Sequence, residues 1–290
     1  MPKQLNNIVL NNLNDVKERI FQQQGIIHAG QVENLCNKLN INIGQLALEL
    51  LPIAESLSIA PTSDFSVGAV GMGQRISHKG YTNMYLGANI EVSASSLTDS
   101  IHAEQCVTSL AIAHGETLSS LAISSTPCGY CRQFLTEFHK PAKLPIQIPD
   151  MLVSDLKELL PLAFGPVDLC ITERVIKPHP TIISATKNKL YSAIEHCYAP
   201  YSGTRTACEI RLKNGNSYAG FSLESAAFNT SLDPLSVAMC IGRMSERDFD
   251  PHQIEHVKIL EEVGKISLKT HIEALCEEIN PAISVDYSTI

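Results

Sequence analysis

The sequence predicts an α/β fold, in which a mixed β-sheet is sandwiched by helices, and predicts that this unit is duplicated after a small N-terminal helical segment. The hydrophobic period changes along the first half, because residues 43–57 follow helical steps whereas residues 65–70 alternate as a strand does. Short segments of the first half recur in the second half, which indicates a repeated domain. The chain has 290 residues, 44% of them hydrophobic, so it can bury two moderate cores.

The first half contains the elements of one such unit. Residues 1–47 are expected to form the N-terminal helical segment, because apolar side chains recur there at three- and four-residue steps. A catalytic domain is expected at 48–150. In chain order its predicted elements are a strand at 65–70, a turn with glycine and charged residues at 71–79, a strand at 81–92, a helix at 100–114, a strand at 118–124 and a helix opened by Pro127.

The second half repeats the first in degraded form. The sequence APYS at 199–202 is similar to APTS at 60–63, and YAGFSLE at 218–224 is similar to YLGANIE at 85–91. Chance similarity is the alternative for segments so short. Residues 151–186 are rich in proline and charge and are expected to connect the two domains, which leaves 187–290 as the degenerate copy.

Charge and cysteine content restrict the partners. The net charge of −8 argues against a broad phosphate-binding surface, so no nucleic-acid partner is expected and a small, uncharged substrate fits better. Nine scattered cysteines, an odd number, favour reduced side chains over a disulfide framework. The N-terminus lacks the pattern of a secretory signal, and no apolar run is long enough to cross a bilayer. We therefore expect no membrane partner and a cytoplasmic location.

Two short segments contain the residues of a candidate zinc site. His102 would supply an imidazole nitrogen, and Cys128 and Cys131 would supply two thiolates. No fourth ligand stands at a usual spacing. Because structural zinc sites normally have four protein ligands and catalytic sites have three, this count predicts a catalytic centre with a position for water. Glu104, two residues after His102, could face that position without binding the metal.

Each part of this pattern has an alternative interpretation. Cys128 and Cys131 alone could form a thioredoxin-like redox pair. His102 alone is more often a surface or core histidine, and Glu104 alone is usually a solvated helix residue. The joint spacing favours the metal site. The second copy is expected to hold no metal, because Leu235-Ser236-Val237 is expected where His102-Ala103-Glu104 stands in the first, and no second C-x-x-C pair follows.

The combination of His102-Ala103-Glu104 with a later Pro-Cys-x-x-Cys resembles the signature of zinc-dependent nucleoside and nucleobase deaminases. As a whole the chain is similar to the longer cytidine deaminases, which have a duplicated domain. The resemblance implies one Zn²⁺ per subunit, a homodimer and a nucleoside substrate. The expected reaction is hydrolysis of cytidine and deoxycytidine to uridine and deoxyuridine plus ammonia, as in pyrimidine salvage. Glu104 would act as the general acid–base, moving a proton to N3 of the pyrimidine and then to the departing ammonia.

The resemblance also implies which residues contact the substrate. Asn89 and Glu91, with Ile90 between them, would hold the ribose hydroxyls. Phe65 would pack beside the pyrimidine or ribose, although a core position in a strand is an equal alternative. The further implied contacts are the backbone at Ala103 and Thr126 for the base edge, and Phe164 for the site of the partner subunit.

One departure from that family, and two rival functions, stay open at this point. Residues 71–84 look longer and more polar than the family's hairpin, so the loop beside the site is expected to differ. The first rival is a deaminase of the same chemistry that acts on nucleotides or nucleic acid. The second is a structural zinc or redox protein in which the three ligands only hold two helices together.

Overall fold

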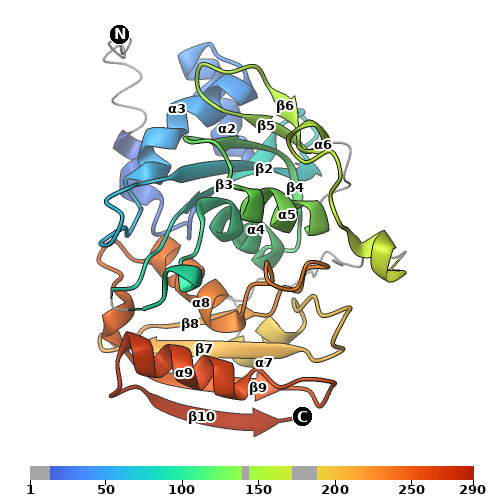
Figure 1. Ribbon diagram of the computed structural model, residues 1–290. Helices are drawn as coiled ribbons and strands as arrows, with labels where there is room; N and C mark the ends of the chain where they lie inside the picture. The colour runs from blue at the N-terminus through green and yellow to red at the C-terminus, as the bar shows by residue number, and fades with distance from the viewer. Residues whose placement is uncertain (1–13, 94, 139–143, 172–187) are drawn as a thin grey trace.

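The computed structural model describes residues 14–93, 95–138, 144–171 and 188–290, and it contains two β-sheets with helices between and around them (Figure 1). The first sheet has six strands in the order β1-β3-β2-β4-β5-β6, and the second has four in the order β10-β9-β7-β8. Both sheets are mixed, since β4 pairs with β5 and β9 pairs with β10 in parallel while the other neighbours are antiparallel. The predicted α/β class with a mixed sheet is confirmed.

The first half contains the larger sheet and the helices that cover it. Its elements are β1 (Ile26–Ile27), α2 (Ala29–Leu39), α3 (Ile43–Glu55), β2 (Gly68–Ile76), β3 (Thr82–Ala88), the 3₁₀-helix η1 (Leu97–Asp99), α4 (Ala103–Ala113), β4 (Leu118–Ile123), α5 (Gly129–Phe138), β5 (Pro145–Gln147), β6 (Ser154–Asp155), α6 (Leu156–Leu159) and η2 (Pro166–Leu169). Helix α3 packs on β2, whereas α4 packs on β2 and β3. In Figure 1, α2 and α3 lie on one side of this sheet and α4 and α5 on the other.

The second half has the same strand order. Its elements are α7 (Lys189–Ile194), β7 (Thr206–Leu212), β8 (Ser217–Phe221), α8 (Pro234–Ser245), η4 (Pro251–Gln253), β9 (Ile254–Glu261), α9 (Lys269–Ile279) and β10 (Ser284–Thr289). The order β8-β7-β9-β10 corresponds to β3-β2-β4-β5, with the same sequence of antiparallel, antiparallel and parallel pairs. The duplication proposed from short sequence echoes is therefore present in the topology.

Isolated bridges fix the register of the two copies. Ile90 bridges Ile59 and Ile101 in the first half, and Leu223 bridges Tyr198 and Leu232 in the second. Glycines give the same register, because a Cβ on Gly87 would lie 2.8 Å from the Ala103 oxygen, and one on Gly220 would lie 2.3 Å from the Pro234 oxygen. Only glycine allows each helix to approach its strand this closely.

This register corrects one expectation about the second copy. Asp233-Pro234-Leu235, and not Leu235-Ser236-Val237, occupies the position of His102-Ala103-Glu104. The sequence comparison was two residues out because the loop before α8 is shorter than the loop before α4. Asp233 is the N-cap of α8, and its carboxylate accepts hydrogen bonds from the backbone N–H groups of Leu235 and Ser236 at 2.9 and 3.0 Å. The second copy therefore has a carboxylate that caps its helix at the position where the first copy has the imidazole of His102.

Several expected boundaries also differ from the structure. Strand β1, which pairs with β3, was not expected in the N-terminal segment, and the boundary placed between residues 47 and 48 falls inside α3. Strand β2 runs from Gly68 to Ile76 and so includes 71–76 of the predicted turn at 71–79, with an irregularity between Met72 and Ile76. The true turn is at 77–81, where the Ser77 N–H donates to the Tyr81 oxygen at 2.8 Å. Glycine and charged residues do not end a strand when a bulge absorbs the irregularity.

The two halves are joined by helix packing and by buried charges. The equivalent helices α4 and α8 pack against each other, and in Figure 1 they lie between the two sheets. Arg243 of α8 is buried, and its Nε donates to the backbone oxygen of Leu57 at 2.6 Å. Glu137 of α5 is 1% exposed and accepts from the hydroxyls of Tyr198 and Tyr201, each at 2.7 Å, and from the N–H of Ala226 at 2.9 Å. These contacts place the second half against the helices of the first.

Candidate active site

The candidate metal ligands come from the starts of two helices, α4 and α5, which follow the ends of the inner strands β3 and β4 of the larger sheet. His102 is the N-cap of α4, and Cys128 immediately precedes α5, whose first turn contains Cys131. One ligand atom from each of the three side chains lies within 4.8 Å of the others, and His102 Nδ1 is 3.6 Å from Cys128 Sγ. Within the described part of the chain, these are the His, Cys, Asp or Glu side chains that converge in this way. The structure thus brings the three predicted ligands together.

The donor set fits zinc. One imidazole nitrogen and two cysteine sulfurs are ligands that Zn²⁺ prefers, and three protein ligands are typical of catalytic sites. The ligands differ in accessibility, since Cys131 is buried, His102 is half-buried and Cys128 is exposed. The group is therefore open to solvent on the Cys128 side.

The two thiols have opposite pKa shifts. The pKa of Cys128 is lowered to about 3, chiefly because the Cys131 side chain donates a hydrogen bond to its sulfur, with further contributions from His102 and the Cys131 N–H. The pKa of Cys131 is raised well above its usual value by that same hydrogen bond and by burial. The pair therefore carries one thiolate before metal binds. A metal ion that binds both sulfurs must therefore displace the second proton.

Glu104 lies behind the ligands and is 3% exposed. Burial raises the pKa of its carboxyl group, while a hydrogen bond from its own backbone N–H opposes that rise. A raised pKa makes a carboxyl group a stronger proton acceptor, and once protonated it can return that proton to a neighbouring group. The position agrees with a non-ligand acid–base residue.

Glu91 is held on a backbone clamp at the rim of the site. Its Oε2 accepts from the N–H groups of Thr62 and Ser63 at 3.0 and 3.1 Å, and its Oε1 accepts from the Ser63 hydroxyl at 2.5 Å. Partial burial opposes the charged form, but the hydrogen bonds from Ser63 and Thr62 outweigh it and lower the pKa of Glu91. The carboxylate is therefore charged, fixed in direction and half-exposed.

Asn89 is buried, and its side chain organises the loop before β2. Its Oδ1 accepts from the Ser58 hydroxyl at 2.7 Å and from the Val67 N–H at 2.8 Å, and its Nδ2 donates to the Phe65 oxygen at 3.0 Å. Phe65 itself is 58% exposed and precedes β2. The alternative in which Phe65 is a core strand residue is wrong, and its ring is accessible next to the site loop.

The other predicted contact residues are placed as follows. Ile90 is fully buried and its backbone bridges Ile59 and Ile101. Ala103 is buried at the start of α4, and Thr126 is exposed just before the Pro127-Cys128 pair. Phe164 is 45% exposed, and its backbone oxygen accepts from Gln133 Nε2 of α5 at 2.5 Å.

The loop that was expected to alter the rim lies elsewhere. Asn89 and Glu91 follow the end of β3 that pairs with the start of β2 at Gly68, whereas the β2–β3 turn at 77–81 is at the opposite end of those strands. Arg75 and Lys79 are engaged there, Arg75 with the Gly115 oxygen at 2.6 Å and Lys79 with Glu33 at 2.9 Å. The polar hairpin therefore does not change the site geometry.

Two neighbours of the ligands were not identified from the sequence. The Tyr130 ring stacks on the His102 ring with centroids 5.9 Å apart, and its hydroxyl donates to the Asn229 oxygen of the second half at 2.7 Å. Gln105 Oε1 accepts from the His102 N–H at 2.9 Å. In the sequence, only its position between Cys128 and Cys131 indicated that Tyr130 lies at the site. Both residues orient His102 from outside the metal coordination.

A sheet of this order with an imidazole and two thiols at two helix starts, plus a buried carboxyl group beside them, defines a zinc-dependent deaminase. The family described as the cytidine and deoxycytidylate deaminase zinc-binding region matches residues 45–146, and a second model of the same description matches residues 156–272. The two matches correspond to the two halves of the chain.

Relatives that match nearly the full length are named cytidine deaminase. The relative from Aliivibrio fischeri is 34% identical over 92% of this chain and 90% of its own length. The relative from Vibrio cholerae is 35% identical over 90% of this chain and 88% of its own length. The relative from Shewanella woodyi is 36% identical, covering 84% of this chain and 82% of its own. A solved cytidine deaminase from Burkholderia pseudomallei is 27% identical over 41% of this chain and 98% of its own, with a TM-score of 0.35. The chain belongs to the cytidine deaminase family, and it is an enzyme whose cofactor is Zn²⁺.

In the described residues, no helix has both the length and the apolar character needed to cross a membrane.

Proposed function

We propose that this enzyme hydrolyses cytidine and deoxycytidine to uridine and deoxyuridine plus ammonia. The observation that supports this most directly is the buried carboxyl group of Glu104 beside three zinc-type ligands that leave a coordination position for water. A structural zinc protein would need a fourth ligand and would have no use for a buried acid with a raised pKa.

The chain's own residues supply the proton chemistry. Zinc bound by His102, Cys128 and Cys131 supplies Lewis-acid activation of water. Glu104 takes a proton from the attacking water and gives it to N3 of the pyrimidine as C4 is attacked. It then takes the proton of the new hydroxyl at C4 and delivers it to the amino group, so that the C4–N bond breaks, ammonia leaves and a carbonyl forms at C4. One carboxyl group thus performs each transfer, and its burial keeps competing water away.

The ribose hydroxyls are proposed to bind at Asn89 and Glu91, and the Asn89 side chain also holds the loop before β2. Two backbone N–H groups and the Ser63 hydroxyl fix the Glu91 carboxylate, so it can accept a hydrogen bond from a sugar hydroxyl without reorganising. Phe65 is the proposed aromatic contact to the pyrimidine or ribose. The backbone at Ile90, Ala103 and Thr126 is proposed to contact the nucleoside, and Phe164 is proposed to reach the site of the partner subunit in a homodimer.

The biological setting is also a proposal. A family member that acts on free nucleosides fits pyrimidine salvage. The nine cysteines are all unpaired, which supports a reducing compartment such as the cytoplasm. Exposed apolar side chains at Met151, Leu152 and Leu162 give the segment around Phe164 a surface suited to a second subunit.

A comparison of cytidine with its 5′-monophosphate tests the substrate class. A phosphate close to Glu91 would meet a fixed negative charge, and two charges 4 Å apart repel by about 1 kcal/mol in water and about 4 kcal/mol near a protein surface. Cytidine should release ammonia with a kcat/KM at least about tenfold above that of the monophosphate. Equal values would favour the nucleotide deaminase instead. Glu91→Gln should weaken cytidine turnover while narrowing the gap between the two substrates.

A further inference from the structure

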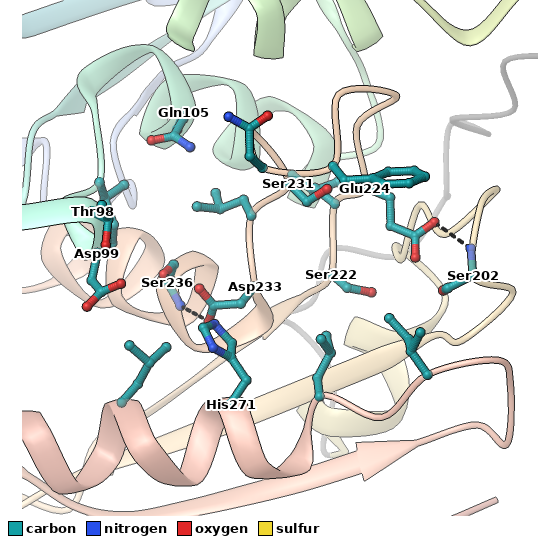
Figure 2. Close-up of a pocket in the computed structure, with 18 of the residues that line it drawn as sticks. Thr98, Asp99, Gln105, Ser202, Ser222, Glu224, Ser231, Asp233, Ser236 and His271 are labelled. Atoms are coloured by element: carbon teal, nitrogen blue, oxygen red, sulfur yellow. Dashed lines mark hydrogen bonds between the residues drawn. The ribbon is translucent and has the colours of Figure 1, made fainter. Parts of the chain in front are cut away.

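A cavity of about 640 Å³ lies between the second half and the start of α4, and it does not include the zinc ligands or Glu104 (Figure 2). Its volume is in the range of small-molecule sites in proteins. Most of its walls come from the second half, and residues from 98–101, together with Gln105 and Tyr130, close it from the first half.

The cavity occupies the position in the second half that the active site occupies in the first. Asp233 stands where His102 stands, because each precedes the equivalent helix by one residue. Leu268 and His271 hold the positions relative to α9 that Cys128 and Cys131 hold relative to α5. All three residues line the cavity. These residues cannot hold zinc as the first set can, because Leu268 has no ligand atom and the Asp233 carboxylate is used to cap α8.

The carboxylate clamp, in contrast, is kept. Glu224 is the counterpart of Glu91, and its Oε2 accepts from the N–H groups of Tyr201 and Ser202 at 2.8 and 3.2 Å. Glu91 is held by Thr62 and Ser63 in the same way, at 3.0 and 3.1 Å. Figure 2 shows Glu224 next to Ser202, with the bond to the Ser202 nitrogen dashed. The two halves thus share this arrangement although they do not share the metal ligands.

One oxygen of this carboxylate is available to a ligand. Glu91 Oε1 is occupied by the Ser63 hydroxyl, whereas Glu224 Oε1 accepts no hydrogen bond from the described residues. Ser222, the counterpart of Asn89, also lines the cavity and places a small hydroxyl where the first half has an amide. The aromatic side chains of Tyr130 and Phe228 and the aliphatic side chains of Leu223 and Leu268 provide apolar walls. This combination suits a ligand with a hydroxyl-bearing end and a flat, apolar face.

We infer that this cavity is a second binding site for a free nucleoside, in which Glu224 accepts a hydrogen bond from a sugar hydroxyl. The inference rests on the proposed function in one respect, namely that Glu91 has the same role in the first half. The bound nucleoside is not deaminated there, because Leu235 replaces the acid–base carboxyl group and the metal ligands are absent. The site is also in contact with the metal centre, since Gln105 and Tyr130, which orient His102, form part of its wall.

The test is the number of uridine molecules that the zinc-loaded, full-length enzyme binds, measured by isothermal titration or equilibrium dialysis. Uridine is the product of the proposed reaction and is not turned over without ammonia. Two uridines per chain are expected at saturation. Glu224→Gln should weaken one of the two sites by about tenfold or more, as expected for the loss of a charge-assisted hydrogen bond, and leave the other unchanged. His271→Trp, at an exposed residue of the cavity wall, should remove the same site by filling it.

Two comparisons make the result specific. Glu277→Gln makes the same change on an exposed face of α9 outside the cavity and should leave both sites intact. Glu91→Gln should weaken the other site, which separates the second site from the catalytic one. A single uridine per chain that Glu224→Gln and His271→Trp leave unchanged would overturn the inference. The proposed function fails by a different readout, the absence of ammonia release from cytidine.

Discussion

At the scale of single residues, Glu104 combines burial with a raised carboxyl pKa at a position where it does not bind the metal. Glu104→Gln keeps the shape of the side chain and removes its ability to carry a proton. We expect zinc content and the unfolding midpoint to stay near those of the native enzyme. Turnover of cytidine should fall by about 10⁴ or more, because general acid–base groups contribute about 10² to 10⁴ and this group acts in several steps.

Metal analysis together with steady-state kinetics checks this expectation. Near-native turnover in a fully zinc-loaded Glu104→Gln protein would contradict the assigned role, and loss of zinc would show that Glu104 supports the ligands instead.

The cysteines provide a second residue-scale prediction. Cys128→Ala or Cys131→Ala leaves two protein ligands, so the purified protein should contain little zinc and show no measurable deamination. Cys106→Ala is the matched control, because Cys106 is a buried cysteine of α4 that packs near Cys240 of α8. It should keep one zinc per chain and lose only a small amount of stability. Equal zinc loss in all three variants would mean that the ligand set is wrong.

At the scale of elements, helix α5 links the metal centre to the second half. Its start carries Cys131 and its end carries Glu137, whose carboxylate accepts three hydrogen bonds from the second half. Glu137→Gln replaces one accepting oxygen with a donor. We expect a loss of about 1 to 3 kcal/mol in the free energy of unfolding, the typical cost of a lost hydrogen bond to a buried charged group. Chemical denaturation measures it, with the exposed Glu277→Gln as the control; equal midpoints would show that Glu137 is not an anchor.

How far the sequence predicts these elements depends on how local their signals are. The ligands His102, Cys128 and Cys131 were found because they belong to two short local patterns, His-Ala-Glu and Pro-Cys-x-x-Cys, each at the start of a helix. The contacts of Glu137 and Arg243 between the two halves were missed, because they join residues more than 60 positions apart and a single charge in an apolar helix does not show what it contacts. The β1 strand has two residues, too few for a period to be seen. The counterpart of His102 in the second copy was placed two residues too late, because the sequence pattern does not show that the loop before α8 is shorter than the loop before α4.

At the scale of the whole molecule, the second half covers the first. Helix α8 packs on α4, and Arg243 caps a backbone oxygen at the end of α3. A chain that ends near residue 180 would expose the buried face of α4 and leave Glu137 without its three donors. We expect an insoluble or inactive product, measured as soluble yield and cytidine turnover. A soluble fragment with native turnover would show that the second half is dispensable.

The covalent link between the halves has a consequence for dilution. If the copy without zinc ligands were a separate subunit, the anchors on α4 and α5 would be lost whenever the protein concentration fell below the dissociation constant of that contact. Within one chain, the second half is present at an effective concentration on the order of millimolar or more, whatever the amount of enzyme. The hydrogen bonds from Tyr198, Tyr201 and Ala226 to Glu137 of α5 therefore do not depend on the concentration of the enzyme. Only contacts between chains remain sensitive to how much enzyme a cell contains.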